Sequence, residues 1–350
     1  MSMRCCVRPV AFAALCVIAA ASGTQAQDAV ESFYRGKQVS IVVGSSPGGG
    51  YDTYARLLAR HFGNAIPGHP SIVVQNMSGA GSNRAAGYIY SVAPKDGTAI
   101  GAIFPGAVLQ PLLSEQPVQH DPSKFVYLGS ANSDVYVCYV RSDAPVTTFK
   151  DVLQKELIVG ASNPGATTYD LPLLLNNIIG AKFKIVTGYP GSREITLALD
   201  RGEVQGACGL GWTGIETLHP EWFKQDKVRV LVQLSTKGHP DLNKRGVPRA
   251  EALARTDDER RVIRLVFSQG EFGRPYILPP GVPEERIAAL RKAFVAALND
   301  KALRAEADKM HFDIDPMAGD ELQKLVAELY ATPPHLVARA KQALSAKPQR

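Results

Sequence analysis

The sequence predicts an α/β fold made of two lobes, each a mostly parallel sheet flanked by helices. β-branched segments alternate along the chain with amphipathic segments of helical period, which is typical of right-handed parallel sheets. The same order of strand, turn and helix starts again near residue 131. The chain of 350 residues is also long enough to bury two hydrophobic cores of modest size.

The first residues predict export. Arg4 and Arg8 precede an apolar run over residues 10–21, and Thr24-Gln25-Ala26 has the small-x-small pattern of a signal-peptidase site. The apolar run is shorter than the roughly 20 residues that span a bilayer. We therefore expect residues 1–26 to be a bacterial signal peptide and the mature protein to lie in the periplasm.

The first lobe is expected over residues 27–130, where strand, small-residue turn and helix follow one another three times. The strand and helix segments read QVSIVVG with TYARLLARHF, SIVVQN with RAAGYIYSVA, and GTAIGAIF with VLQPLL. The second lobe is expected over residues 131–238, with the same order in ELIVGASNPGATTYDLPLLLNNIIG and in FKIVTGYPGSREITLALDRGEV. Residues 239–350 are expected to return to the first lobe and to end in helices.

Charge and composition argue against several classes of protein. The chain has 39 Lys and Arg against 33 Asp and Glu, and the basic residues are scattered along it, which argues against a nucleic-acid partner. The sequence has no Cys-x-x-Cys, no His-x-x-x-His and no cluster of carboxylates. We therefore expect no metal and no cofactor, and a monomer whose weak positive charge attracts small anions.

Two cysteines, Cys138 and Cys208, remain once a signal peptide is removed. In an oxidising compartment they can pair. Each also lies in an apolar run, VYVCYV or VQGACGL, where a buried free cysteine packs as a small hydrophobic side chain. Both alternatives stay open, because spacing does not tell whether the two Cα atoms come close enough to bridge.

The turn GSSPGGG at residues 44–50 has two interpretations, and the first is catalytic. Gly44-Ser45-Ser46-Pro47-Gly48 matches the G-x-S-x-G nucleophile elbow of serine hydrolases, with a strand before it and a helix after it. That elbow uses the backbone N–H of the residue after the serine, and Pro47 has none. Only about 20 mature residues precede the turn, too few for the strands that come before such an elbow. A secreted serine hydrolase is kept as the alternative, with His120, His219 and His239 in no recognisable setting.

The second interpretation is a cradle of backbone amides for an anion. Gly48, Gly49 and Gly50 have no Cβ, so their N–H groups can approach a ligand at a helix N-terminus, where the helix dipole favours negative charge. A carboxylate fits, whereas the Gly-Lys-Ser/Thr ending of a nucleotide-binding loop is missing. Glycines that merely permit a tight turn are the plain alternative. The turns SGAGS, PGA and NPGATT also follow expected strands, where open α/β sheets bind ligands.

These motifs resemble the Bug-type receptors, which are the periplasmic substrate-binding proteins of tripartite tricarboxylate transporters. The resemblance rests on Pro47-Gly48-Gly49-Gly50-Tyr51-Asp52, Asn76, Gly79-Ala80-Gly81 and Pro94-Lys95-Asp96-Gly97 in the first lobe. It continues through GYPGSREITLALDRGEV and YILPPGVPEERIAALRKAF, and so covers nearly the whole mature chain.

The resemblance implies a type II-like periplasmic binding protein whose two lobes close on a small organic acid and deliver it to a membrane permease, without catalysis. In such receptors main-chain groups of the first turn hold one carboxylate, and side chains of the other lobe select the rest of the ligand. The first turn corresponds here to Ser46 through Asp52. We expect Asp52 to shape the turn rather than to face an anion, which it would repel. Pro105 and Gly106 are expected in the neighbouring wall.

Residues of the second lobe are expected to decide which acid binds. The candidate contacts in the turn ASNPGATT are Ser162, Gly165, Thr167 and Thr168. Arg193 follows GYPGS, where its guanidinium could take a second carboxylate or be solvated at the surface. The segment GEVQGACGLGW has Gln205 and Gly209 where some relatives have an acid.

Three aromatic residues, Tyr51, Phe104 and Trp212, lie in or beside the candidate turns. They suit an apolar or ring-shaped ligand body, although core packing is the alternative for each of them. The expected ligand is therefore a dicarboxylate or an aromatic carboxylate.

Overall fold

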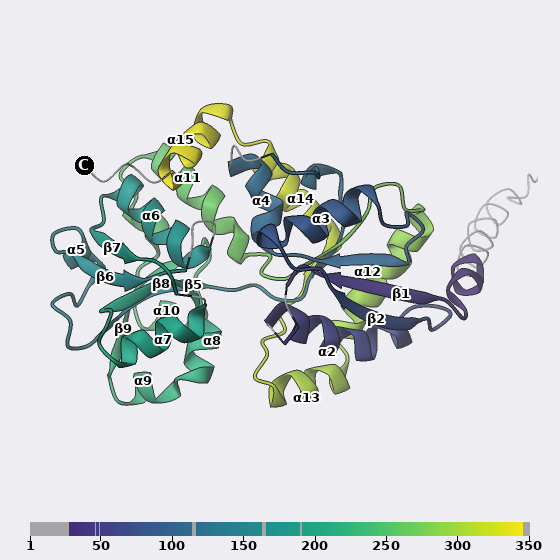
Figure 1. The fold of residues 1–350 in the computed structure, drawn as a ribbon, viewed down its shortest axis with the longest axis horizontal. Coiled ribbons are helices and arrows are strands. Elements are labelled where there is room, and N and C mark those ends of the chain that lie inside the picture. Colours follow the sequence, from purple (N-terminus) through teal and green to yellow (C-terminus); the bar gives the residue numbers. More distant parts are fainter. Residues whose placement is uncertain are drawn as a thin grey trace, which may run out of the picture.

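Figure 1 shows a computed structural model of the chain, in which two lobes stand side by side. The structure describes residues 28–345 except Ser46, Gly49, 114–116, 163–165 and Pro190, and it describes the backbone but not the side chains of Arg193, Thr217 and Leu218. The predicted signal peptide lies outside the described residues. Within the described range, none of the helices combines the length and the apolar character that a membrane crossing needs.

The first lobe is built on a six-stranded sheet in the order β11-β4-β10-β3-β1-β2. β1 is parallel to both β2 and β3, and β10 lies antiparallel between β3 and β4. The bounds of these strands are β1 Gln38–Val43, β2 Ser71–Asn76, β3 Ala99–Ala102, β4 Val126–Ser130, β10 Pro275–Leu278 and β11 Met317–Ala318.

The second lobe is built on a five-stranded sheet in the order β7-β6-β8-β5-β9. β6 is parallel to β7 and β8, whereas β5 lies antiparallel between β8 and β9. The predicted α/β fold in two lobes is thus confirmed. The bounds of these strands are β5 Tyr136–Arg141, β6 Leu157–Gly160, β7 Phe183–Val186, β8 Gly206–Gly211 and β9 Val228–Leu234.

The helices cover both faces of the two sheets (Figure 1). Their bounds are α2 Gly50–Ala65, α3 Asn83–Ser91, α4 Pro105–Leu113, α5 Phe149–Val152, α6 Thr167–Ile179, α7 Ser192–Asp200, α8 Trp212–Leu218, α9 Pro220–Lys224, α10 Pro240–Lys244, α11 Asp257–Phe267, α12 Glu284–Leu298, α13 Lys301–Lys309, α14 Gly319–Tyr330 and α15 Pro334–Leu344. Short 3-10 turns lie at η1 Ala80–Ser82, η2 Pro122–Lys124, η3 Ala250–Leu253 and η4 Ser268–Gly270.

Helix α2, which begins at the first glycine-rich turn, shows how the sequence directs the fold. Its buried side chains Tyr54, Leu57, Leu58 and Phe62 recur three or four positions apart, so they share one face. That face packs against β2, α12 and α13. Asp52 in its first turn also complements the positive end of the helix dipole.

The chain crosses between the lobes at residues 131–135, from β4 to β5, and again at 271–274, from η4 to β10. Residues that follow β9 still pack on the second lobe: Leu242 shares its core, and Arg249 bridges to Gln233 of β9. The boundaries at 130 and 238 stay predictions, and on this packing we propose to place the second boundary near residue 270.

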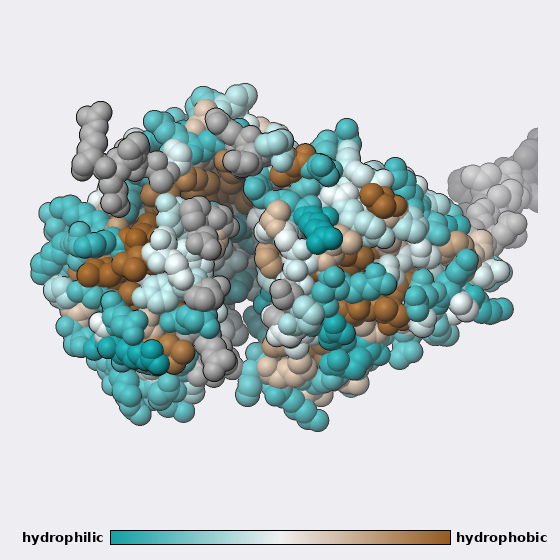
Figure 2. Space-filling model, viewed as in Figure 1, coloured by the Kyte–Doolittle hydropathy of each residue, from teal (hydrophilic) through white to brown (hydrophobic). Residues whose placement is uncertain are grey.

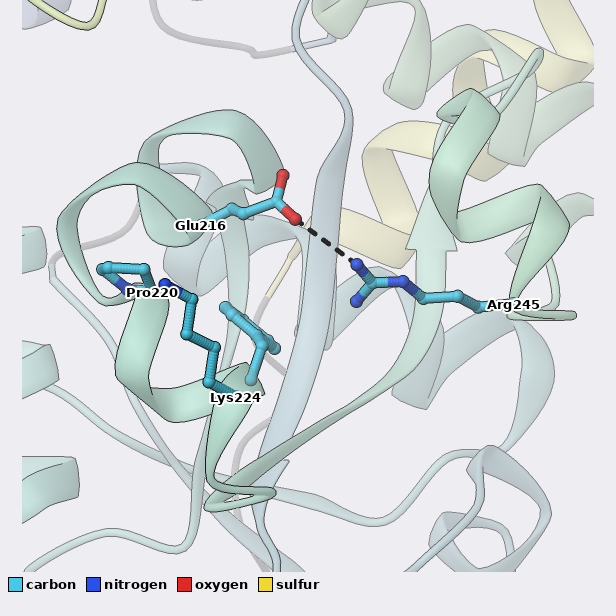
Figure 3. Close-up of a pocket in the computed structure, with 5 residues that line it drawn as sticks. Glu216, Pro220, Lys224 and Arg245 are labelled. Atoms are coloured by element: carbon cyan, nitrogen blue, oxygen red, sulfur yellow. Dashed lines mark hydrogen bonds and ion pairs between the residues drawn. The ribbon is translucent and has the colours of Figure 1, made fainter.

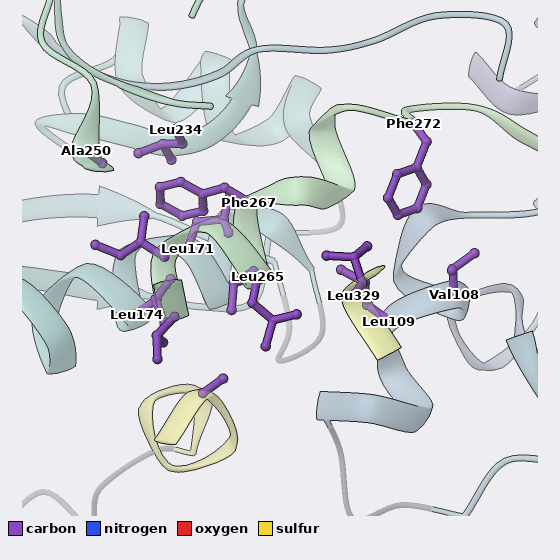
Figure 4. Close-up of a cluster of buried hydrophobic side chains, with 14 of the residues drawn as sticks. Val108, Leu109, Leu171, Leu174, Leu234, Ala250, Leu265, Phe267, Phe272 and Leu329 are labelled. Carbon is purple, nitrogen blue, oxygen red and sulfur yellow. The ribbon is translucent and has the colours of Figure 1, made fainter. Parts of the chain in front are cut away.

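One hydrophobic core extends through both lobes. It begins on the face of the first sheet covered by α3 and α4, and it continues without a break to α6 and α11 on the second sheet. Figure 4 shows Leu109 of α4, Leu329 of α14, Leu265 of α11 and Leu174 of α6 in this cluster. Helix α15 packs against α4, α6 and α11, so the C-terminal helix contacts both lobes.

The two cysteines that remain after the signal peptide are joined by a disulfide. Cys138 of β5 and Cys208 of β8 are paired residues of adjacent antiparallel strands, and their sulfurs are bonded. Of the two alternatives left open by the sequence, the structure has the bridge.

Candidate functional site

The loops that follow β1, β2 and β3 lie together beside the crossings between the lobes. Tyr51, in the first turn of α2, donates a hydrogen bond from its hydroxyl to the carbonyl oxygen of Gly273 in the second crossing, over 2.8 Å. Its ring lies 4.3 Å from the ring of Phe104, which follows β3. Figure 2 shows an open groove between the two lobes. The start of α2, which follows the candidate carboxylate turn, is therefore placed next to the second crossing between the lobes.

The carboxylate of Asp52 braces the first turn. Only 2% of the residue is exposed. One oxygen accepts hydrogen bonds from the Gly48 N–H at 2.8 Å and the Arg56 Nε at 2.9 Å, and the other accepts from the Asn76 Nδ2 at 2.8 Å. Burial alone would raise the pKa of Asp52, but these hydrogen bonds outweigh it and hold that pKa below its usual 3.8. As expected from the sequence, Asp52 shapes the turn.

Asn76 connects the first two loops. Its Nδ2 also donates to the carbonyl oxygen of Ser45, over 3.0 Å. The amide at the end of β2 thus ties the first turn together, because one amide nitrogen donates to a carboxylate and a carbonyl at once. Ser46 and Gly49, two of the predicted ligand residues, lie outside the described residues.

A close backbone approach connects the first loop to the third. The Ser82 hydroxyl accepts a hydrogen bond from the N–H of Phe104, over 3.1 Å. Gly44 lies so near that a Cβ placed on it would overlap the Ser82 hydroxyl and lie 2.7 Å from the Ser82 Cβ. Gly44 therefore permits the packing of Ser82, so the first glycine of the G-x-S-x-G motif has a structural role that requires no nucleophile.

Pro105 and Gly106 begin α4 directly after Phe104, next to Tyr51. The Pro105 side chain is buried, whereas a Cβ on Gly106 would meet no atom within 4 Å. That these two residues form a wall of the cleft stays a prediction.

In the second lobe, the turn before α6 is organised by Thr168, whose hydroxyl accepts from the N–H of Ser162 over 3.1 Å. Thr168 is buried and Thr167 is half-buried. A Cβ on Gly209 would lie 2.6 Å from the carbonyl carbon of Thr167, so glycine at this position lets α6 begin close against β8. Gly165 lies outside the described residues.

Trp212 does not lie on the groove. Its side chain is fully buried in the core of the second lobe, 4.9 Å from the ring of Phe223. The expectation that it lines the ligand is corrected on this packing: the chain turns into α8 after Gly211, which directs the indole inward. Arg193 is the second residue of α7, and its side chain lies outside the described part of the chain.

Two charged residues that the sequence did not indicate lie at the crossings. Arg274 places its guanidinium 4.6 Å from the centre of the Tyr51 ring and 4.1 Å from that of Tyr54. Asp134 lies on the other crossing, with its carboxylate against Gly211. Burial raises the pKa of Asp134 to about 6, although Arg274 acts to lower it. The sequence carried no sign of these two residues beyond a charged side chain in each segment that crosses between the lobes.

A surface cavity of about 330 Å³ lies elsewhere in the second lobe (Figure 3). Glu216, Pro220, Phe223, Lys224 and Arg245 line it. Glu216 and Arg245 form an ion pair at 3.4 Å across it. These residues come from α8, α9 and the segment after α10, all of which belong to the second lobe. Within the described ranges, no three His, Cys, Asp or Glu side chains are grouped to hold a metal ion.

Comparison with known proteins gives matches in sequence and in structure. No protein-family model matches the chain. A curated relative from Agrobacterium vitis, described as a UPF0065 protein in the TAR-I ttuE-ttuC' intergenic region, is 28% identical over 194 residues. The match spans 53% of this chain and 53% of the relative, so it covers about half the length of each.

Solved structures resemble the chain over most of its length. A TctC solute binding protein from Polaromonas has a TM-score of 0.67 at 20% identity, over 89% of this chain and 99% of that chain. MatC from Rhodopseudomonas palustris, solved with bound malate, has a TM-score of 0.61 at 20% identity, over 88% and 99% of the chains. Rpa4515 of R. palustris, solved with adipate, has a TM-score of 0.62 at 22% identity, over 87% and 97%.

At these identities the structural likeness establishes the fold. The resemblance that the motifs indicate is thereby confirmed in three dimensions: the chain has the two-lobed fold of the TctC and Bug-type periplasmic solute-binding proteins.

Proposed function

We propose that this protein is a periplasmic receptor that captures a small organic carboxylate and passes it to the permease of a tripartite tricarboxylate-type transporter. The observation that supports this most strongly is the braced turn at the N-terminus of α2. Its residues 44–50 have no basic side chain. The Gly48 N–H already donates to Asp52, so an anion bound there is held by other backbone N–H groups of the turn and by the helix dipole, an arrangement suited to a carboxylate.

The location and the partners follow from the same proposal. The basic residues, apolar run and cleavage pattern before residue 27 suit export to the periplasm. Isolation of the mature protein from the periplasm, with an N-terminus at Gln27, tests this. The permease partner is inferred from the resemblance to transporter receptors, and pull-down from solubilised membranes with and without ligand tests it. Size-exclusion chromatography tests the expected monomer.

We further propose a ligand with two polar ends. Malate and adipate, bound to two of the similar structures, are both dicarboxylates. Arg193 is the second residue of α7, in the segment that follows β7, so its guanidinium is the candidate for the second carboxylate. The half-buried rings of Tyr51 and Phe104 would contact an apolar ligand body, which also keeps an aromatic carboxylate among the candidates.

The three histidines considered for a serine hydrolase give it no support. His120 is buried under α4, where its Nε2 lies 2.9 Å from the carbonyl oxygen of Ala107. His219 stacks on Trp222 at 4.0 Å, and the Nδ1 of His239 accepts a hydrogen bond from Asp241 over 3.3 Å. All three have roles away from the turn that contains Ser45 and Ser46, so the non-catalytic function is preferred.

A thermal-shift screen tests the proposal. The ligands are mono-, di- and tricarboxylates, both aliphatic and aromatic. A ligand at a hundred times its Kd stabilises the protein by about 2.7 kcal/mol, which is an easily measured rise in melting temperature. Chloride and sulfate at equal ionic strength serve as controls for nonspecific anion effects. A protein that no carboxylate stabilises beyond these controls would refute the proposal.

A further inference from the structure

We infer that Arg274 is the cationic side chain of the ligand site, where its guanidinium holds the carboxylate that binds at the N-terminus of α2, and that Asp134 is the anion with which this carboxylate competes. The inference rests on the proposed function, because it assigns residues to the same site.

Arg274 is held against the first turn. Its guanidinium lies over the rings of Tyr51 and Tyr54, which both belong to α2. Its Nη2 would be 3.7 Å from a Cβ on Gly50, the first residue of that helix. The hydrogen bond from Tyr51 to Gly273 fixes the preceding residue of the chain. The positive charge and the helix N-terminus are therefore directed at the same small volume, where they reinforce each other for an anion.

The hydrogen-bonding capacity of Arg274 is not used up by the protein. Among the described residues, its Nε is buried and has no hydrogen-bond partner. Aromatic faces attract a guanidinium, but they do not replace the oxygen acceptors that its five N–H groups require. A buried donor left unpaired is costly, and a bidentate carboxylate is the ligand whose geometry suits a guanidinium best.

Asp134 supplies the opposite charge from the other crossing. Its backbone N–H donates to the Gly270 carbonyl oxygen over 2.7 Å, and its carboxylate packs against Gly211, so it is fixed to the second lobe. Its negative charge favours the charged form of Arg274. A ligand carboxylate near Arg274 would meet repulsion from Asp134 as well as attraction from the guanidinium. Removal of the two charges should therefore change affinity in opposite directions.

Calorimetric titration of the full mature protein with malate and with adipate tests the assignment. Arg274→Gln is expected to lower the affinity for whichever dicarboxylate the wild type binds by about thirtyfold or more. This is the loss typical of unpairing a buried hydrogen-bonded charge. Arg274→Lys keeps the positive charge but loses the two parallel N–H donors of the guanidinium, so its affinity should lie between those of the wild type and Arg274→Gln. Asp134→Asn is expected to tighten binding several-fold. A residue that merely maintained the hinge would weaken binding in both variants.

Arg245→Gln is the matched control. Arg245 also stacks on an aromatic ring, 5.4 Å from the centre of the Trp212 ring, but it is paired with Glu216 in the cavity of the second lobe. Its removal should leave dicarboxylate affinity unchanged.

The outcomes separate the inference from the function on which it rests. If the wild type binds neither malate nor adipate, the dicarboxylate proposal and the inference fail together. If the wild type binds and Arg274→Gln, folded by circular dichroism, binds equally well, only the role of Arg274 is refuted. Should Arg274→Gln fail to fold, Asp134→Asn decides: tighter binding supports the inference, and unchanged or weaker binding overturns it.

Discussion

Substitution of Gly44 by alanine should damage the site through one defined collision. Gly44 has a backbone conformation without positive φ, so alanine costs nothing through the backbone. The added methyl group would overlap the Ser82 hydroxyl and lie 2.7 Å from its Cβ and 3.2 Å from its Cα. Ser82 is 1% exposed, and with φ of 77° it has little freedom to move.

Two costs contribute to the expected loss of stability. Overpacking in a tight interior typically costs about 1–3 kcal/mol. Displacing Ser82 also removes the acceptor of the Phe104 N–H, and a buried unpaired donor costs about 1–3 kcal/mol. We therefore expect Gly44→Ala to lower the free energy of unfolding, measured by urea denaturation, by about 2–6 kcal/mol. Gly106→Ala, where the methyl group enters open space, is the control and should cost little.

A double-mutant cycle isolates the collision. Ser82→Gly removes the hydroxyl and suits a positive φ, although it leaves the Phe104 N–H unpaired. In the double variant the overlap with the hydroxyl and Cβ disappears. The loss of unfolding free energy in the double variant should therefore be smaller, by at least about 1 kcal/mol, than the sum of the losses in the two single variants. Strict additivity, or a Gly44→Ala variant as stable as Gly106→Ala, would refute this account of the turn.

In the first turn, Gly49→Val should weaken carboxylate binding far more than Ser46→Ala, whose loss is limited to the roughly 0.5–1.5 kcal/mol of one hydrogen bond; calorimetry showing the reverse order would contradict a backbone cradle. Hydrogen bonds hold the pKa of Asp52 below 3.8, so its ionised form stabilises the fold above that pH, and the contribution is lost as the pH falls through the lowered pKa. The unfolding free energies of wild type and Asp52→Asn, measured from pH 7 to pH 2, should therefore converge in acid, and a constant gap would argue against this. Arg193→Ala should weaken a dicarboxylate about thirtyfold or more but hardly affect a matched monocarboxylate; equal losses in titrations of both would make Arg193 a surface residue. Ligand should also reduce the radius of gyration measured by small-angle X-ray scattering, because the groove lies between lobes joined by short crossings, and an unchanged radius at saturation would exclude closure.

The sequence was informative wherever short-range chemistry determines structure. Alternating strand and helix patterns predicted both sheets, because a strand that is covered by helices on both faces of its sheet must be apolar along its length. The role of Asp52 was predictable because an acid in the first turn of a helix, just after glycines, has backbone donors within reach. Nothing local distinguished Trp212 from a ligand-facing aromatic residue, because its burial depends on Phe223 across the second lobe.

Arg274 and Asp134 show the limit most clearly. Each has an unremarkable setting in its own segment, and the two approach one another only because the chain leaves the first lobe at one and returns at the other. Their proximity is a property of topology rather than of spacing. The strand order of the first sheet, in which β10 lies between β3 and β4, could not be inferred from hydrophobic patterns alone.

The hydrophobic core that extends from α4 through α15 to α6 and α11 has a consequence for how the protein unfolds. Neither lobe can lose its structure alone without exposing apolar side chains of the other to water. The two lobes therefore form one cooperative unit, and heat or urea should produce a single transition rather than one for each sheet. For the same reason, a chain that ends before α15 would leave apolar surfaces of both lobes uncovered, so the stability of both lobes depends on this helix.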